Sequence, residues 1–222
     1  LADSFCAVPR EPGAENPSLP TGANGVPNPA KLDESREASA VSRREIPEVP
    51  GAYQLLNVFS REECDRLIEL TENLGYLKDA AVSLPREVRH NDNVTWVVDE
   101  VTDRLIWQRV RDAVADNLDL FGHKQPLGIN RRFRFYRYSE GDFFKFHIDG
   151  AWPGSRVVDD RLIADAFPDR FSQMTFLILL SDDFEGGETR FLVDADDPTK
   201  PARRSDNVRE IDVRTPAGGV LC

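Results

Sequence analysis

Hydrophobic and polar positions alternate with a period of two over two neighbouring stretches in the middle of the chain. Residues 131–138 read RRFRFYRY and residues 142–149 read DFFKFHID, with Ser-Glu-Gly between them. Successive side chains of a strand point to opposite faces, so this alternation predicts two strands joined by a turn. One face of the second strand holds Lys145, His147 and Asp149, and the other holds Phe144, Phe146 and Ile148.

Two other stretches repeat their apolar positions at helical spacing. Ser60 to Glu63 has the form of a capping box, so a helix is predicted to start there and to end at Gly75. A second helix is predicted from about residue 102 to 121, with Gly122 as its stop. Their buried sides hold, in order, Cys64, Leu67, Ile68, Thr71 and Leu74, and Leu105, Ile106, Val110, Ala113, Val114 and Leu118.

The remaining segments predict mostly short strands. Residues 173–180 are apolar on both faces, which is typical of a strand inside a layered structure, and residues 159–166 suggest a short helix. Further strands are predicted at 52–59, 80–84, 95–98, 208–214 and 220–222. Helices followed by short strands with glycine-rich turns favour an α+β protein, in which antiparallel strands form a sandwich or barrel and the helices pack outside.

The first 50 residues contrast with this pattern. They contain 8 of the 15 prolines and show almost no apolar periodicity. Such a segment buries too little apolar surface to offset its ordering entropy, so residues 1–50 are predicted to be a disordered tail or linker, with a docking peptide as the alternative. The domain is expected to span 51–222. Because the chain begins with Leu1 and stops within a predicted strand, we expect it to be truncated at both ends.

Charge and composition restrict the partners. The formal net charge of -11 argues against binding nucleic acid through its phosphates, although Arg131, Arg132, Arg134 and Arg137 leave a local basic patch open. No apolar run is long enough for a membrane-spanning helix, so a soluble protein is expected, in the cytoplasm rather than in the endoplasmic reticulum, which stays open. The three cysteines are widely spaced and predict neither a disulfide framework nor a zinc knuckle.

His147 and Asp149 are candidates for binding a metal ion. Two positions apart on one strand face, their backbones are about 6.5 Å apart, and an imidazole beside a carboxylate can bind a metal from two directions. Taken alone, a His-x-Asp triplet is most often an accident of composition. A second triplet, His90-Asn91-Asp92, lies in wholly polar surroundings and is interpreted as a solvated loop.

The wider motifs resemble the 2-oxoglutarate- and Fe(II)-dependent oxygenases of the prolyl 4-hydroxylase alpha-subunit type. The resemblance covers residues 58–222. It is carried by the Y-x-x-G…H-x-D pattern from Tyr138 to Asp149, by LSDDFEGGETRF at 180–191, by TPAGGVLC at the end, and by EVRHNDNVTWVVDE before the second helix.

The resemblance implies a double-stranded β-helix, or cupin-like jelly roll, with the two main helices packed outside. It implies Fe(II) held by His147 and Asp149, and Tyr138 hydrogen-bonded to the distal carboxylate of 2-oxoglutarate; a strand tyrosine covering the core is the alternative for Tyr138. The implied reaction uses O2 and 2-oxoglutarate, with ascorbate as an optional helper. It hydroxylates a C–H bond, most simply of peptidyl proline in a peptide or protein, or of a small molecule, and gives succinate and CO2.

The sequence departs from the family's pattern at one point. The family's second histidine ligand and its basic residue for 2-oxoglutarate follow the turn that stands here at 216–221, and no histidine follows His147. We expect both residues to lie beyond Cys222 and the chain as given to be inactive in 2-oxoglutarate decarboxylation. The alternative is a catalytically inactive cupin-like module that binds a metal or ligand, or serves as a scaffold.

Overall fold

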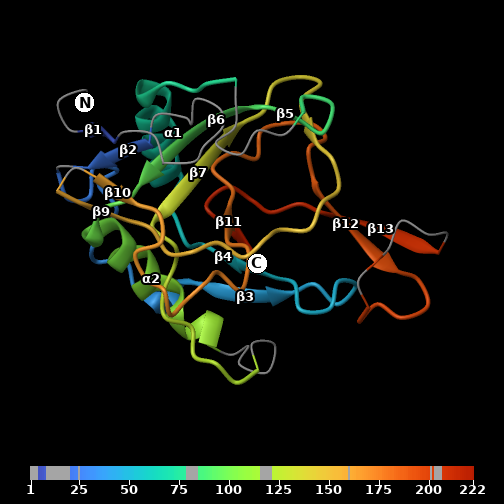
Figure 1. Cartoon of the computed structure of the whole chain (residues 1–222). Coiled ribbons are helices and arrows are strands. Elements are labelled where there is room, and N and C mark those ends of the chain that lie inside the picture. Colours follow the sequence, from blue (N-terminus) through green and yellow to red (C-terminus); the bar gives the residue numbers. More distant parts are fainter. Residues whose placement is uncertain are drawn as a thin grey trace.

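The protein is an α+β structure of mostly antiparallel strands and two α-helices (Figure 1). The computed structural model describes residues 5–8, 21–24, 26–78, 85–115, 122–159, 161–200, 202 and 207–222. The helices are α1 (Arg61–Leu74), α2 (Glu100–Ala115) and the short 3-10 helix η2 (Ala38–Ala40). The predicted class is therefore confirmed.

Two four-stranded sheets and three strand pairs make up the β-structure. The first sheet has the order β1 (Phe5–Val8), β2 (Thr21–Asn24), β6 (Asp92–Val97), β7 (Arg132–Arg137), with β2 and β6 parallel. The second, wholly antiparallel, has the order β11 (Leu177–Ile178), β14 (Val220–Leu221), β4 (Tyr53–Leu56), β3 (Ser42–Glu45). The pairs are β5 (Arg89–His90) with β8 (Phe143–Phe144), β9 (Arg156–Val158) with β10 (Arg161–Ile163), and β12 (Thr189–Asp194) with β13 (Val208–Val213). Over the described ranges these strands do not close into a barrel.

Helix α1 forms as its sequence predicts. The Ser60 hydroxyl accepts from the backbone N–H of Glu63, and the Glu63 carboxylate accepts from the backbone N–H of Ser60, which completes the capping box. Gly75 ends the helix at a φ of 89°, a conformation that costs glycine little. The helix buries Cys64, Leu67 and Leu70 against the core.

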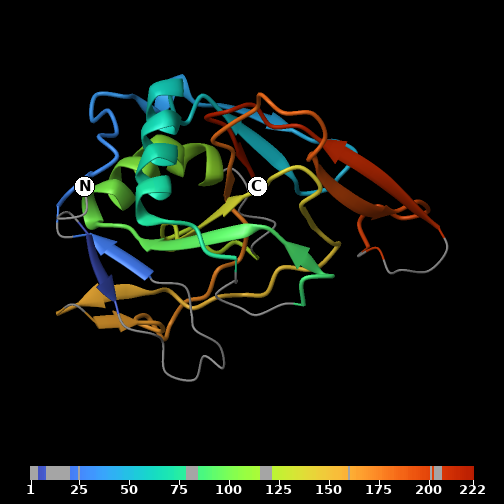
Figure 2. The same cartoon turned by 90° about the horizontal axis from the view of Figure 1, so that it is seen from above.

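The main core lies between the two helices and the two large sheets. In Figure 2, α1 and α2 lie on one side of the green strand β6, and the orange β9–β10 hairpin lies on the other. The helices contribute Leu67 and Val110, β4 contributes Leu55, and β6 contributes Trp96, all of them buried. This packing leaves the opposite face of β6 and β7 for the residues of the candidate site.

Three segments differ from their predicted structure. The strand predicted over 142–149 pairs only at Phe143–Phe144, and the strand predicted over 173–180 pairs only at Leu177–Ile178. The helix predicted over 159–166 is wrong, because Asp159 takes a φ of 49° and turns the chain between β9 and β10. The predicted strand at 80–84 and the end of the second helix lie outside the described residues.

Part of the predicted tail belongs to the folded domain. Ala30 and Leu32 are buried in the main core, and β3 pairs with β4 over four residue positions. The prediction of disorder up to residue 50 is therefore wrong for residues 26–50. Low hydrophobicity misled it, because this segment is fixed chiefly by polar contacts.

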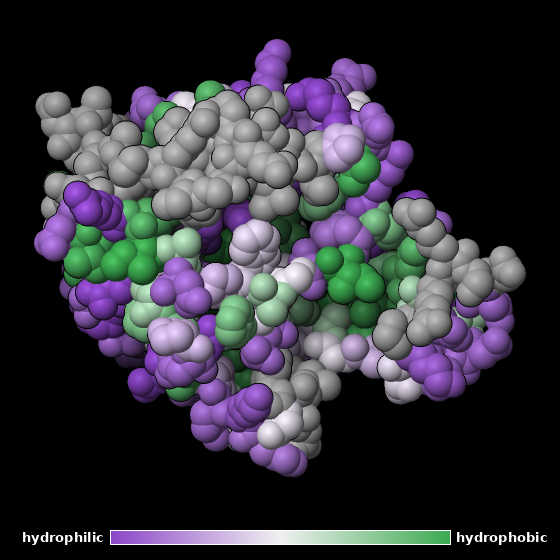
Figure 3. Space-filling view, viewed as in Figure 1, coloured by the Kyte–Doolittle hydropathy of each residue, from purple (hydrophilic) through white to green (hydrophobic). Residues whose placement is uncertain are grey.

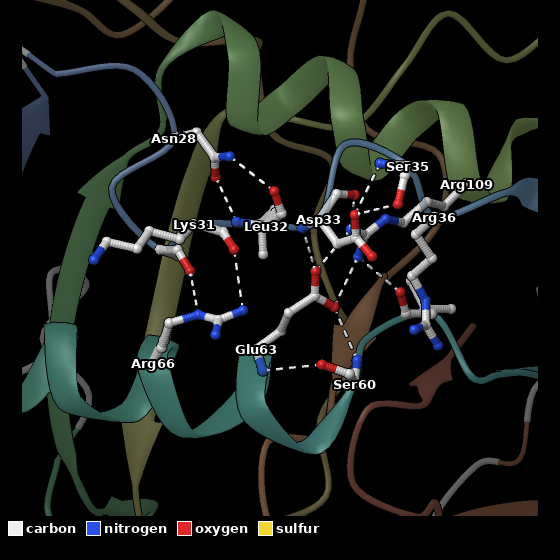
Figure 4. Close-up of polar contacts among 12 residues, drawn as sticks. Asn28, Lys31, Leu32, Asp33, Ser35, Arg36, Ser60, Glu63, Arg66 and Arg109 are labelled. Atoms are coloured by element: carbon white, nitrogen blue, oxygen red, sulfur yellow. Dashed lines mark hydrogen bonds and ion pairs between the residues drawn. The ribbon is translucent and has the colours of Figure 1, made fainter.

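Those polar contacts centre on a buried ion pair between the two helices (Figure 4). Arg109 of α2 donates to both carboxylate oxygens of Glu63 of α1, at 2.7 and 3.0 Å, and both side chains are 1 % exposed. The pair also holds the N-terminal segment, because Arg109 donates to the carbonyl of Asp33 and Glu63 accepts from its N–H. One buried carboxylate thus joins both helices to residues 28–36.

Acid is expected to weaken this junction. Burial raises the pKa of Glu63, but hydrogen bonds from Arg109 and from the N–H groups of Asp33 and Ser60 outweigh it, so the pKa lies below 4.5. A carboxyl whose pKa is depressed by folding stabilises the fold above its unfolded pKa, and this contribution disappears as pH falls through the folded pKa. Urea denaturation below about pH 5 should therefore show a steeper loss of stability for the natural chain than for Glu63→Gln. Identical pH dependence in the two proteins would exclude this role for Glu63.

Gly218 is expected to tolerate no side chain. It has a φ of 78°, and a Cβ there would lie 2.3 Å from the carbonyl oxygen of Phe59, whose N–H donates to the Gly218 carbonyl. Gly141 is a matched control, because its φ is 79° and a Cβ would meet no atom within 4 Å. We expect Gly218→Ala to lower the free energy of unfolding by about 3 kcal/mol and Gly141→Ala by about 1 kcal/mol. Chemical denaturation would measure both, and equal losses would contradict the steric argument.

Candidate metal centre

The sheet formed by β6 and β7 has one apolar and one polar face. Phe133 and Phe135 of β7 pack against Trp96 and the main core. The alternate residues Arg134 and Tyr136 point to the other side, and Tyr138 continues this face just beyond β7. Residues 143–153 reach this polar face at both ends. Arg89, whose guanidinium lies over the rings of both Phe144 and Tyr136, joins one end, and Trp152, which lies 4.3 Å from the guanidinium of Arg134, joins the other.

His147 and Asp149 lie in direct contact in this segment. The Nε2 atom of His147 is 3.2 Å from Oδ1 of Asp149, and Nδ1 is 2.8 Å from the carbonyl oxygen of Lys145. A carbonyl only accepts, so Nδ1 carries a proton and donates it, and Nε2 is the nitrogen that faces the carboxylate. Two acceptors in this position repel each other unless a proton or a cation lies between them.

This arrangement fits a metal ion. Ligand atoms about 2.1 Å from one metal and at right angles to each other lie about 3 Å apart, close to the observed separation of Nε2 and Oδ1. Metal-bound histidines commonly donate their second N–H to a carbonyl or carboxylate, as Nδ1 does here. We refer to His147 and Asp149 together as the clamp.

Neighbouring side chains hold both members of the clamp. The hydroxyl of Thr175 donates to Oδ2 of Asp149, which leaves Oδ1 toward the histidine. The imidazole of His147 stacks on the ring of Phe144, with 3.7 Å between the ring centres. The sequence did not single out Thr175, because the residues between 149 and 175 give no periodic signal that would bring the two together.

The clamp is open to solvent. The side chains of His147 and Asp149 are 40 % and 55 % exposed, and the intervening Ile148 is 88 % exposed. Figure 3 shows hydrophobic surface on this side of the molecule, between the C-terminus and β12. The apolar residues predicted to share one strand face are therefore not all packed inside, because pairing ends at β8 and the chain continues extended without a partner strand.

Tyr138 lies on the polar face next to two buried residues. Burial of its phenol raises the pKa of Tyr138, and the nearby side chains of Asn91 and Arg89 lower it in part. Half of its surface is nonetheless exposed, so a core tyrosine is not what the structure contains. Its position on the polar face suits a group that donates a hydrogen bond to a ligand.

The second His-x-Asp triplet is not a solvated loop. His90 ends β5 and Asp92 begins β6, and the Nδ1 atom of His90 contacts the carboxylate of Asp142. The N–H of Ser139 and then His90 lower the pKa of Asp142. The alternation of Arg89, Asn91 and Asn93 is the signal that would have predicted strands here. This contact joins the turn after Tyr138 to β5.

Over the described ranges no third histidine, cysteine or carboxylate joins the clamp in a metal-binding cluster. Among the same residues, no helix is both long and apolar enough to cross a membrane. No protein-family model, no curated protein and no solved structure matches the chain.

Proposed function

We propose that the chain binds Fe(II) through His147 and Asp149 and acts as a 2-oxoglutarate-dependent oxygenase of the prolyl 4-hydroxylase alpha-subunit type. The observation that carries the proposal is the clamp, in which two metal-binding atoms face each other at 3.2 Å and are oriented from behind by Lys145 and Thr175. The sequence motifs around it add to this support.

The proposal includes a jelly roll as the finer description of the fold. The antiparallel order β11-β14-β4-β3, the hairpin β12–β13 and the two helices packed on the β-structure are compatible with it. In such a fold the clamp follows the strand pair β5–β8, and the turn after Tyr138 connects the tyrosine to it.

Each group has a separate task in the proposed reaction. Bound Fe(II) would supply the activation of O2 that hydroxylates the substrate and converts 2-oxoglutarate to succinate and CO2. His147 and Asp149 hold the metal, and the phenol of Tyr138 donates to a carboxylate of 2-oxoglutarate. Peptidyl proline, the substrate that the motifs suggest, is apolar, and exposed Ile148 and Trp152 beside the clamp offer it apolar contact.

A metal-binding module without turnover is the second candidate. It is favoured by the two-residue clamp and by its exposure, since a hydroxylating centre works best when water is kept out. In this candidate a metal binds but gives 2-oxoglutarate no added affinity.

The affinity for 2-oxoglutarate with and without Mn(II), a redox-inert substitute for Fe(II), separates the two candidates. We expect Mn(II) to tighten 2-oxoglutarate binding at least about tenfold, because the keto and carboxylate oxygens together complete the coordination of the metal. Isothermal titration calorimetry of the natural chain measures this, with Asp149→Ala as the variant that should lose the gain. Equal affinity with and without Mn(II) would reject the oxygenase in favour of the second candidate.

A further inference from the structure

A row of polar side chains leads along the polar face toward the clamp. Arg89, Asn91 and Asn93 occupy alternate positions through β5 and β6 and therefore share one face. Asn93 is paired with Tyr136 in the register of β6 and β7, which brings Asn91 beside Tyr138. This row is surrounded by protein, yet it is polar throughout.

Two buried polar atoms on this face have no partner. They are Nδ2 of Asn91 and Oγ1 of Thr95, in residues that are 3 % and 1 % exposed. The amide of Asn91 is fixed in orientation, because its Oδ1 accepts from Nδ2 of Asn93 at 2.8 Å. Its Nδ2 therefore points elsewhere as a donor, near enough to Tyr138 to lower the phenol's pKa but outside hydrogen-bond geometry. A buried donor without an acceptor costs stability, and such groups commonly mark the place of a ligand, ion or water.

Arg89 adds a positive charge at the same place. It is 8 % exposed, and its guanidinium lies 5.7 Å from the ring centre of Tyr136 and 5.1 Å from that of Phe144. Phe144 in turn stacks on His147. A buried guanidinium, one aromatic ring away from the clamp and beside a spare amide donor and a phenol, is a combination that suits a carboxylate. The chain as a whole has a charge of -11, so this local cation does not follow from composition.

We propose that Arg89, Asn91 and Tyr138 bind one carboxylate of a small dicarboxylate whose other end reaches the clamp. This inference rests on the proposed function, in which that dicarboxylate is 2-oxoglutarate. The resemblance assigns the cation of this site to a residue that follows the second histidine, whereas here β5, on the other side of the clamp in sequence, supplies it. Arg89 provides the charge, and Asn91 and Tyr138 each provide one hydrogen-bond donor.

Glutarate is the probe that isolates this site. It has the two carboxylates of 2-oxoglutarate but no keto oxygen for a metal, so its binding can be measured by calorimetry on the whole chain in EDTA. We expect Arg89→Gln to weaken glutarate binding about tenfold or more and Tyr138→Phe to weaken it several-fold, because each removes a donor to a charged group. Arg111→Gln, which removes an exposed arginine from α2, should leave it unchanged.

Arg89 is buried, so circular dichroism and a thermal melt must accompany the comparison, and the half-exposed Tyr138 serves as the second variant if Arg89→Gln does not fold. Glutarate binding equal to that of the natural chain in Tyr138→Phe and in folded Arg89→Gln, or no glutarate binding by the natural chain, would overturn the inference. Arg89-dependent glutarate binding without any effect of Mn(II) on 2-oxoglutarate would leave the inference standing and reject the oxygenase. The reverse pattern would reject only the inference.

Discussion

Arg109→Leu is expected to lower the free energy of unfolding by about 3–5 kcal/mol, because it leaves the buried carboxylate of Glu63 without its cation. The loss extends beyond one ion pair. Arg109 also donates to the carbonyls of Val58 and Asp33, so its removal leaves two further acceptors without this donor. Urea denaturation of the two proteins at neutral pH measures the difference.

Two comparisons separate charge burial from a general loss of packing. The double variant Glu63→Leu/Arg109→Leu should recover a large part of the loss, because no unpaired charge is left inside. The ion pair of Arg190 with Asp212 is half-exposed on the β12–β13 hairpin, so Arg190→Ala should cost less than about 1 kcal/mol. If Arg109→Leu costs no more than Arg190→Ala, the junction of the helices with residues 28–36 does not depend on this pair.

His147→Ala is expected to abolish measurable Mn(II) binding, since it removes one of the two protein ligands of the clamp. Thr175→Val should weaken binding by about tenfold to a hundredfold, the usual effect of losing a group that orients a metal ligand, and Thr175→Ser should restore it. Electron paramagnetic resonance of free Mn(II) during a titration measures all three affinities in the same way.

His123→Ala is the matched control for this series. His123 lies in an exposed turn after α2, so removing its imidazole should leave Mn(II) binding unchanged. A metal held by scattered surface carboxylates of this acidic chain would instead bind equally to His147→Ala, His123→Ala and the natural protein. That result would remove the basis of the proposed function.

Local signals in the sequence predicted the parts of the fold that depend on near neighbours. The capping box at Ser60 and the stop at Gly75 define α1 from within a few residues, and the contact between His147 and Asp149 follows from their spacing. These features need no knowledge of the remaining chain.

Features that depend on distant residues could not be predicted in this way. Residues 28–36 look like a disordered linker until Arg109, more than 70 positions later, is brought to Asp33. The orientation of Asp149 depends on Thr175, and the position of Arg89 depends on the pairing of β5 with β8. Strand pairing also ended sooner than alternation indicated, because alternation shows which faces side chains occupy and not whether a partner strand exists.

The central claim is that a metal ion binds between His147 and Asp149. Anomalous diffraction from crystals grown with Mn(II), with data collected on both sides of the manganese absorption edge, tests it most directly. The account predicts a single strong anomalous peak within bonding distance of both Nε2 of His147 and Oδ1 of Asp149, with Nδ1 still directed at the carbonyl of Lys145. A clamp without a peak, with the imidazole and carboxylate still 3.2 Å apart, would show that a proton and not a metal joins them, and would contradict the account.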